Sequence, residues 1–152
     1  MPTIVVRTLI NAPIQTVFDA ARNVEIHTKT TVHTREKIVG GRRTGLLELG
    51  NEVTFRATHL FVRQKLSARI VEMNAPFGFT DEMLRGAFQS LRHEHRFENV
   101  GNGTRMTDVL TWTSPLGVLG TFADWLFLKS YMTRFLARRN CELKHIVEAQ
   151  TL

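Results

Sequence analysis

The residues most able to do chemistry in this chain lie in the stretch SLRHEHRF, residues 90–97, where His93 and His95 are two positions apart. Because side chains alternate along a strand, both imidazoles would share one apolar face, and Arg92, Glu94 and Arg96 would share the opposite one. Histidine titrates near neutral pH, so the pair could act in acid and base catalysis, with a carboxylate such as Asp108 orienting one ring.

Two imidazoles at this spacing could also bind one Zn²⁺ or Fe²⁺, with His59, Asp81 or Asp108 as a further ligand. A two-residue spacing is easily met by chance, however, and the sequence does not single out the third ligand. The chain has one cysteine, so a cysteine-based metal cluster and an internal disulfide are excluded. We therefore predict no bound metal and no cofactor, and interpret the pair as buried structural imidazoles or as ligand contacts.

The same alternation places other ionisable side chains among apolar ones. It groups His59 with Val53, Phe55, Ala57 and Phe61, Asp81 with Phe77, Phe79 and Met83, and Asp108 with Met106, Leu110 and Trp112. Each buried polar group needs a partner, so these side chains would either converge on one ligand or satisfy one another.

A series of short elements would position these residues. Residues 3–10 are rich in β-branched and aliphatic side chains and predict a strand. Asn11 and Pro13 predict the start of a short helix to about Arg22, and Asn23 predicts the cap of a second one to about Lys29. The period then changes to two, which predicts strands over residues 33–39, 51–61, 65–73, 77–83, 91–97 and 105–112, the first of them ending at Gly40 and Gly41.

One long helix should close the chain. Ser114 and Pro115 form a second helix start, with serine as N-cap, and apolar residues then recur at helical spacing for about thirty residues. The order of elements predicts an α+β fold, in which a curved antiparallel sheet of about seven strands wraps round the C-terminal helix and two short helices follow the first strand. The space between sheet and helix is the candidate site.

Composition indicates a single domain over residues 1–152, with 43% hydrophobic and 22% charged residues. The net charge of +6 is spread along the chain, and no run of aromatic and basic residues resembles a nucleic-acid-binding face, so we expect no nucleic-acid partner. The N-terminus has no pattern of a signal peptide, which favours a cytoplasmic protein. The apolar run over residues 116–128 is too short to span a bilayer.

Three segments carry a family resemblance: INAPIQTVFDAARN near the start, FGFTDEMLRGAFQSLRHEHRFENVGNGTRMTDVLTWTSPLG in the middle and RFLARRNCELKHI near the end. They resemble the SRPBCC (START/Bet v 1-like) superfamily, most closely bacterial members described as polyketide cyclase/dehydrase-like or ligand-binding. The resemblance implies a helix-grip fold with an internal cavity for apolar or amphipathic small molecules. It does not imply a reaction, because one fold supports many functions.

Three functional hypotheses follow. The first is binding of an apolar or amphipathic small molecule, lipid or polyketide-like, in the cavity. The second is an enzyme of cyclase, dehydratase or hydrolase type that uses His93 or His95 together with Asp108 as acid and base. The third is a membrane-peripheral or partner-binding adaptor. The oligomeric state stays open. The residues expected to line the site are Phe55, His59, Phe79, Asp81, Met83, His93, His95, Met106, Asp108, Trp112, Phe122 and Trp125.

Overall fold

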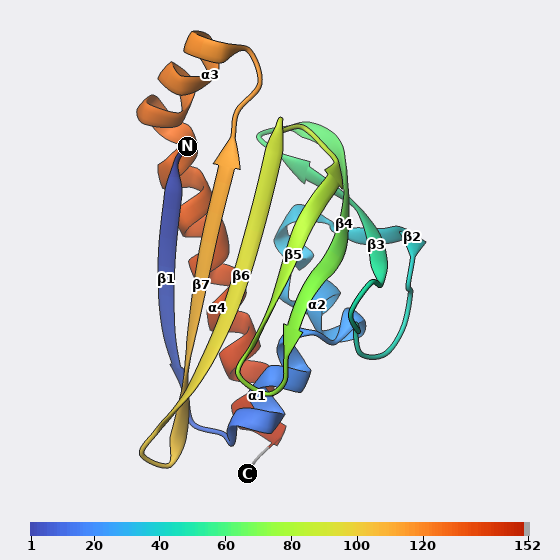
Figure 1. The fold of residues 1–152 in the computed structure, drawn as a ribbon, viewed down its shortest axis with the longest axis vertical. Coiled ribbons are helices and arrows are strands. Elements are labelled where there is room, and N and C mark those ends of the chain that lie inside the picture. The colour runs from blue at the N-terminus through green and yellow to red at the C-terminus, as the bar shows by residue number, and fades with distance from the viewer. Residues whose placement is uncertain (151–152) are drawn as a thin grey trace.

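One antiparallel sheet of seven strands forms the frame of the protein in the computed structural model, which describes residues 1–150 (Figure 1). The strands lie in the order β1-β7-β6-β5-β4-β3-β2. Their bounds are β1 Thr3–Ile10, β2 Lys37–Gly41, β3 Glu52–His59, β4 Val62–Asn74, β5 Gly78–Arg85, β6 Ser90–Val100 and β7 Gly103–Thr113. The predicted curved sheet of about seven strands is confirmed.

The helices form two groups along the chain, one after β1 and one after β7. After β1 come α1 (Ile14–Ala21), α2 (Val24–Thr30) and the short 3₁₀ turn η1 (Val32–Thr34). After β7, the helix α3 (Gly117–Ala123), the π-helical segment η2 (Asp124–Leu128) and α4 (Lys129–Gln150) follow one another without a break. α4 packs against β1, α1 and α2, and Figure 1 shows it running along the sheet away from α3. The helix-grip fold is therefore confirmed.

The core lies between the sheet and these helices. Phe18 of α1 makes edge-to-face ring contacts with Phe79 of β5 and Phe97 of β6, and Leu143 of α4 belongs to the same cluster. A second cluster surrounds Trp112 of β7, which is fully buried. Aromatic rings supply large buried areas, so these two clusters fix how α1 and α4 lie on the sheet.

Two of the three predicted helix caps are wrong. The Asn23 side chain does accept a hydrogen bond from the Ile26 amide at 2.9 Å. Because α1 begins only at Ile14, however, the cap position falls on Pro13, and no side chain caps that helix. The long helix likewise begins later than expected, with Leu116 at the cap, and the Ser114 hydroxyl instead donates to Asp124 at 2.6 Å.

The first strand of the predicted meander is also shifted. Residues 32–34 form η1, and β2 begins at Lys37 and includes Gly40 and Gly41 as its last two residues, instead of stopping before them. Gly41 has φ +71, and a Cβ at this position would lie 2.2 Å from the backbone oxygen of Glu52. The glycine therefore allows β2 to approach β3 closely, which is a different use of glycine from the turn that the sequence suggested.

Phe61 and Phe77 do not point inward as predicted, because each lies in a turn. Leu60 and Phe61 both have positive φ and form the tight connection between β3 and β4, which leaves Phe61 fully exposed. Phe77 lies in the turn between β4 and β5 and is 54% exposed. Side chains alternate between the two faces only within strands, so this rule could not predict the direction of these two rings.

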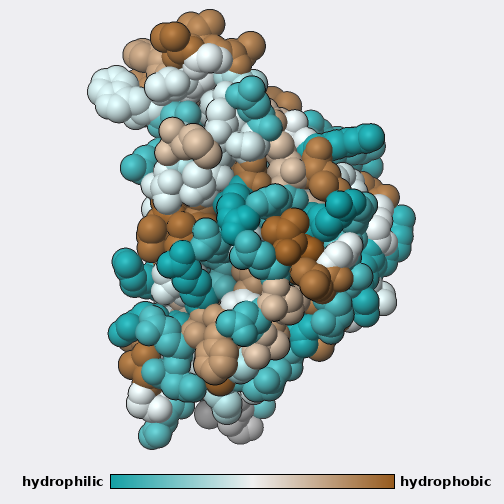
Figure 2. Space-filling model, in the orientation of Figure 1, coloured by the Kyte–Doolittle hydropathy of each residue, from teal (hydrophilic) through white to brown (hydrophobic). Residues whose placement is uncertain are grey.

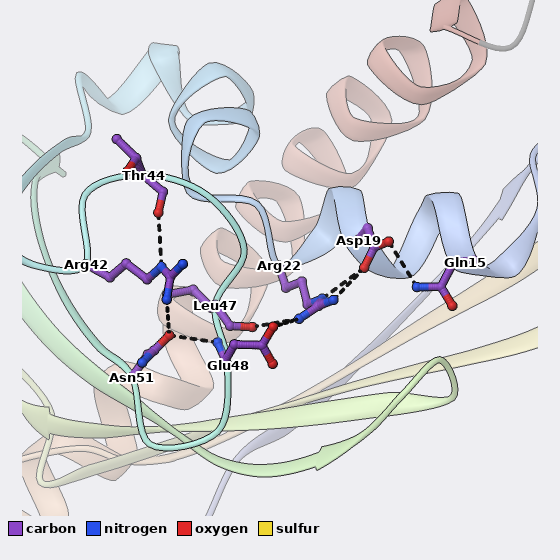
Figure 3. A network of polar contacts seen from close by, with 8 residues as sticks. All are labelled: Gln15, Asp19, Arg22, Arg42, Thr44, Leu47, Glu48 and Asn51. Atoms are coloured by element: carbon purple, nitrogen blue, oxygen red, sulfur yellow. Dashed lines mark hydrogen bonds and ion pairs between the residues drawn. The ribbon is translucent and has the colours of Figure 1, made fainter.

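A polar network ties the loop between β2 and β3 to α1 (Figure 3). Arg22 donates to Asp19 at 2.7 Å, to Glu48 at 2.8 Å and to the Leu47 carbonyl at 3.2 Å. At the other end of the loop, Asn51 accepts from Arg42 and from the Glu48 amide. The network holds Leu47 against the body of the protein, where it lines the cavity described next.

Candidate functional site

A cavity of about 420 Å³ lies between the sheet and the C-terminal helices. Its wall is mostly apolar and includes Val53 and Ala57 of β3, Ala68 of β4 and Leu136 of α4. At one end the lining residues Leu60, Leu116 and Leu119 are strongly exposed, so the cavity opens between the β3–β4 turn and α3. Its volume is in the usual range for small-molecule sites.

Six of the twelve residues expected to line the site face this cavity, and six do not. Those that line it are Phe55, His59, Phe79, Asp81, His93 and His95. Those outside it, and so corrections to the expected lining, are Met83, Met106, Asp108, Trp112, Phe122 and Trp125.

The residues outside the lining fall into three groups. Met106, Asp108 and Trp112 point inward from β7, but α4 and η2 cover that part of the sheet and bury them. Phe122 and Trp125 lie at the other extreme, 57% and 78% exposed on the outer side of α3 and η2. Met83 packs in the cluster around Trp112. A position on the inward face of a strand, or in the apolar first turns of a helix, is thus not sufficient for a side chain to reach the cavity.

A chain of buried side chains connects the cavity wall to α4. His95 Nε2 lies 3.1 Å from Asp81 Oδ2, and His93 Nε2 lies 2.8 Å from Asp108 Oδ1. The other Asp108 oxygen accepts from the Asn140 amide at 2.6 Å. The two imidazole rings are 3.8 Å apart between centroids. Of the two alternatives that the sequence left open, these contacts correspond to ionisable side chains that pair with one another, although His95 Nδ1 has no hydrogen-bond partner within residues 1–150.

Burial and pairing act on these groups in opposite directions. Burial disfavours the charge of Asp108, but its contacts with His93 and His95 outweigh that effect and hold its pKa well below the usual value. Burial also lowers the pKa of His93, and the nearby charge of His95 lowers it further. For His95, the contacts with Asp108 and Asp81 outweigh burial, so its pKa is raised. The surroundings thus favour the neutral form of His93 and the charged form of His95.

Several polar residues that line the cavity were not predicted from the sequence. They lie in the helices and in the connection between η1 and β2. His27 of α2 pairs with Glu36 at 2.5 Å and stacks on Phe55. Tyr131 of α4 contacts His59 Nδ1 through its hydroxyl at 2.8 Å.

Arg139 of α4 is a further missed residue, and it is 7% exposed. A signal for it was present in the sequence. Arg139 lies three residues after Leu136 and four before Leu143, so it falls on the apolar stripe of the helix.

The arrangement could serve three kinds of chemistry. The apolar wall can enclose a hydrocarbon body, while the groups around Asp81 and Arg139 can contact a polar end. The His93 and Asp108 pair can orient an imidazole for proton transfer. Donor atoms of Asp81, His93 and His95 also lie within 4.8 Å of one another, close enough to surround a metal ion, and the predicted absence of metal stays a prediction.

Solved structures share this fold over at least nine tenths of their length. The Thermus thermophilus protein TTHA0849 has a TM-score of 0.82 at 16% identity, over 99% of this chain and 100% of that chain. Protein Ms6760 from Mycobacterium smegmatis has 0.74 at 17%, over 97% and 92%. The major latex-like protein 151 from Panax ginseng has 0.69 at 13%, over 95% of each chain.

Ara h 8.0201 is also similar, with a TM-score of 0.64 at 13% identity over 93% of this chain and 97% of that one. No protein-family model and no curated protein matches the sequence. The structural matches agree with the resemblance to the SRPBCC (START/Bet v 1-like) superfamily at the level of the helix-grip fold. No helix within residues 1–150 is both long and apolar enough to cross a lipid bilayer.

Proposed function

We propose that this helix-grip protein binds an apolar or amphipathic small molecule, lipid or polyketide-like, in the cavity between its sheet and α4. The observation that carries the proposal is the cavity itself, which has a mostly apolar wall and a smaller set of polar side chains, among them Asp81, His95 and Arg139. Such a division suits a molecule with one apolar body and one polar end. The solved neighbours include Ara h 8.0201 and a major latex-like protein, which supports a fold able to hold a ligand.

Intact mass spectrometry of freshly purified protein tests this proposal. Under native conditions we expect an added mass of roughly a few hundred daltons, the size of a molecule that such a cavity encloses, and we expect it to disappear on denaturation. Thermal unfolding with a panel of fatty acids and aromatic polyketides should also show stabilisation, because binding to the folded state alone raises stability. Equal native and denatured masses, together with no stabilisation by any panel member, would overturn the proposal.

A second candidate function is acid and base catalysis in the same cavity, of cyclase, dehydratase or hydrolase type. It is favoured by one specific observation: His93 lines the cavity while its Nε2 contacts the buried carboxylate of Asp108, which orients the ring. Perturbed imidazoles in a cavity are typical of functional sites. Turnover of polyketide or ester substrates that survives unchanged in a His93→Gln, His95→Gln variant would rule this function out.

A third candidate function, peripheral membrane contact, is favoured by the exposed residues around the cavity mouth. We name Phe61, Leu116, Leu119, Phe122 and Trp125 the apolar rim; each is between 57% and 101% exposed. The exposed cations Arg63, Lys65 and Lys129 follow closely in the chain, and the acidic residue within this part of the long helix, Asp124, is buried. A surface that combines apolar side chains with cations suits an anionic bilayer.

A further inference from the structure

Arg139 is a buried, charged residue in the wall of the cavity. It is 7% exposed and lines the cavity from the middle of α4. A guanidinium presents five N–H donors and is always charged. Among residues 1–150, no hydrogen bond or ion pair joins this guanidinium to another side chain or to a backbone carbonyl. Buried charges are normally paired, so this one requires an acceptor.

The carboxylates near Arg139 are already engaged with other residues. Burial raises the pKa values of Glu36 and Asp81, but the nearby imidazoles and, to a smaller extent, the charge of Arg139 outweigh burial and lower them. Neither carboxylate lies within ion-pair distance of Arg139, however. Glu36 pairs with His27 at 2.5 Å, and Asp81 contacts His95 at 3.1 Å. The polar groups beside Arg139 thus satisfy one another and leave its donors facing the cavity.

We propose that the cavity ligand carries a carboxylate, and that Arg139 binds this group while the apolar body extends toward the mouth. This inference rests on the proposed function and names its ligand class, an apolar organic acid. A guanidinium matches a carboxylate with two parallel hydrogen bonds, which gives both affinity and orientation.

The position of Arg139 along α4 fits this orientation. Leu128 lines the cavity from the last position of η2, directly before α4, and Arg139 follows eleven residues later in the sequence. At 1.5 Å per helical residue, the two are roughly 16 Å apart along the helix axis. Lining residues between these two positions include Met132, Phe135 and Leu136, which are apolar. A straight hydrocarbon chain with its acid group at Arg139 would therefore contact apolar side chains over its length.

Calorimetric titration with three probes of one chain length tests the inference. The probes are dodecanoate, dodecanol and dodecylammonium, which share their hydrocarbon body and differ in the charge of the head group. We expect dodecanoate to bind about ten- to a hundred-fold more tightly than dodecanol, as expected for a charge-assisted hydrogen-bonded pair. Dodecylammonium should bind most weakly, because it would place a second cation beside Arg139.

The variant Arg139→Gln should remove the preference for dodecanoate and keep the binding of dodecanol. Arg138→Gln is the matched control, since this neighbour is exposed and loses the same charge. If Arg139→Gln does not fold, Arg139→Met removes the same guanidinium and replaces it with an unbranched apolar side chain. The comparison of the three probes on the wild type also tests the inference without any variant.

The outcomes separate this inference from the proposed function. Equal binding of dodecanoate and dodecanol to the wild type, or a preference that persists in Arg139→Gln, would overturn the acid-binding role and leave small-molecule binding intact. A preference for dodecylammonium would also overturn it, and would assign head-group recognition to Glu36 and Asp81. Failure of all three probes to bind would count against both.

Discussion

His95 lies directly opposite Asp108 in the β6–β7 ladder, yet the hydrogen bond to that carboxylate comes from His93, whose cross-strand partner is Leu110. His95 Nδ1 is 2.9 Å from Asp108 Oδ1, but the angle is too bent for a hydrogen bond, and this buried nitrogen has no hydrogen-bond partner among residues 1–150. Because an ionised carboxylate only accepts, Nε2 of His93 must carry the proton. Asp108 therefore fixes the tautomer of His93.

Replacing Asp108 by asparagine should strongly destabilise the protein. The carboxylate is fully buried and accepts from both His93 and Asn140, so an amide NH₂ in place of one oxygen would face another donor. We expect a loss of about 2–4 kcal/mol in the free energy of unfolding, measured by urea denaturation. Glu98→Gln, which removes an exposed ion pair with Arg105, should cost less than about 0.5 kcal/mol. Equal effects of the two variants would show that the buried network contributes little.

His93 and His95 should titrate on opposite sides of the ordinary histidine pKa. Burial and the charge of His95 lower the pKa of His93, whereas Asp108 and Asp81 outweigh burial and raise that of His95. NMR titration of the ring Cε1 protons, assigned with His93→Gln and His95→Gln, measures both directly. Removing His95 should also raise the pKa of His93, because a neighbouring positive charge is lost. A single shared midpoint in the wild type would contradict this assignment.

The same two shifts predict how stability depends on pH. The raised pKa of His95 gives stability that is present below the unfolded pKa of about 6.5 and is lost as pH rises through the folded value. His93 acts in the other direction, because its folded pKa is lowered: its stability is present above about 6.5 and is lost as pH falls through the folded value. We therefore expect urea denaturation of the wild type to show a free energy of unfolding that decreases above about pH 6.5, and we expect His95→Gln to remove this decrease.

The sequence predicted the interior of strands better than their connections. The bounds of β1 agree with the prediction, and strict alternation in β6 placed His93 and His95 on the buried face, because each residue there has a neighbouring strand on both sides. The turn residue Phe61 has no such constraint, and its ring points to solvent.

The cavity was harder to predict than the sheet, because its outline depends on where α4 lies. Asn140 and Arg139 contribute to the buried network and to the cavity wall through packing of the helix on the sheet. Asp108 was expected in the lining but is covered by that same helix. Local periodicity carries no information on the distance between two packed elements, so it could not separate cavity positions from covered ones.

Asp124 should hold the start of the long helix onto the sheet. Its Oδ1 accepts from the Trp112 indole at 2.9 Å and from the Ser114 hydroxyl at 2.6 Å, and the side chain is buried. In Asp124→Ala, both donors lose their acceptor, and we expect a loss of about 1.5–3 kcal/mol. Amide hydrogen exchange over residues 117–128 should accelerate more than in α4. The control is Thr121→Ala, which removes only an exposed bond to the Gly117 carbonyl; similar exchange in both variants would contradict the anchoring role.

The apolar rim should mediate contact with anionic membranes at the cavity mouth. Figure 2 shows hydrophobic surface gathered at the end of the molecule formed by α3, and the exposed turn between β3 and β4 adds Phe61. In a flotation assay with vesicles that contain an anionic phospholipid, we expect binding that weakens as salt is raised, because the nearby cations are screened. The double variant Phe61→Ser, Trp125→Ser should reduce partitioning at least ten-fold, since each ring removed from water contributes roughly 1.5–3 kcal/mol.

Phe77→Ser provides the matched control for this experiment. Phe77 is an exposed ring like those of the rim, but it follows the C-terminal end of β4, whereas Phe61 precedes the N-terminal end of that strand. Because β4 is thirteen residues long, the two rings lie at opposite ends of the sheet and cannot enter one flat bilayer together. An equal loss of vesicle binding in Phe77→Ser would indicate nonspecific adsorption of exposed aromatic rings, and absence of wild-type binding at low salt would rule out the membrane role.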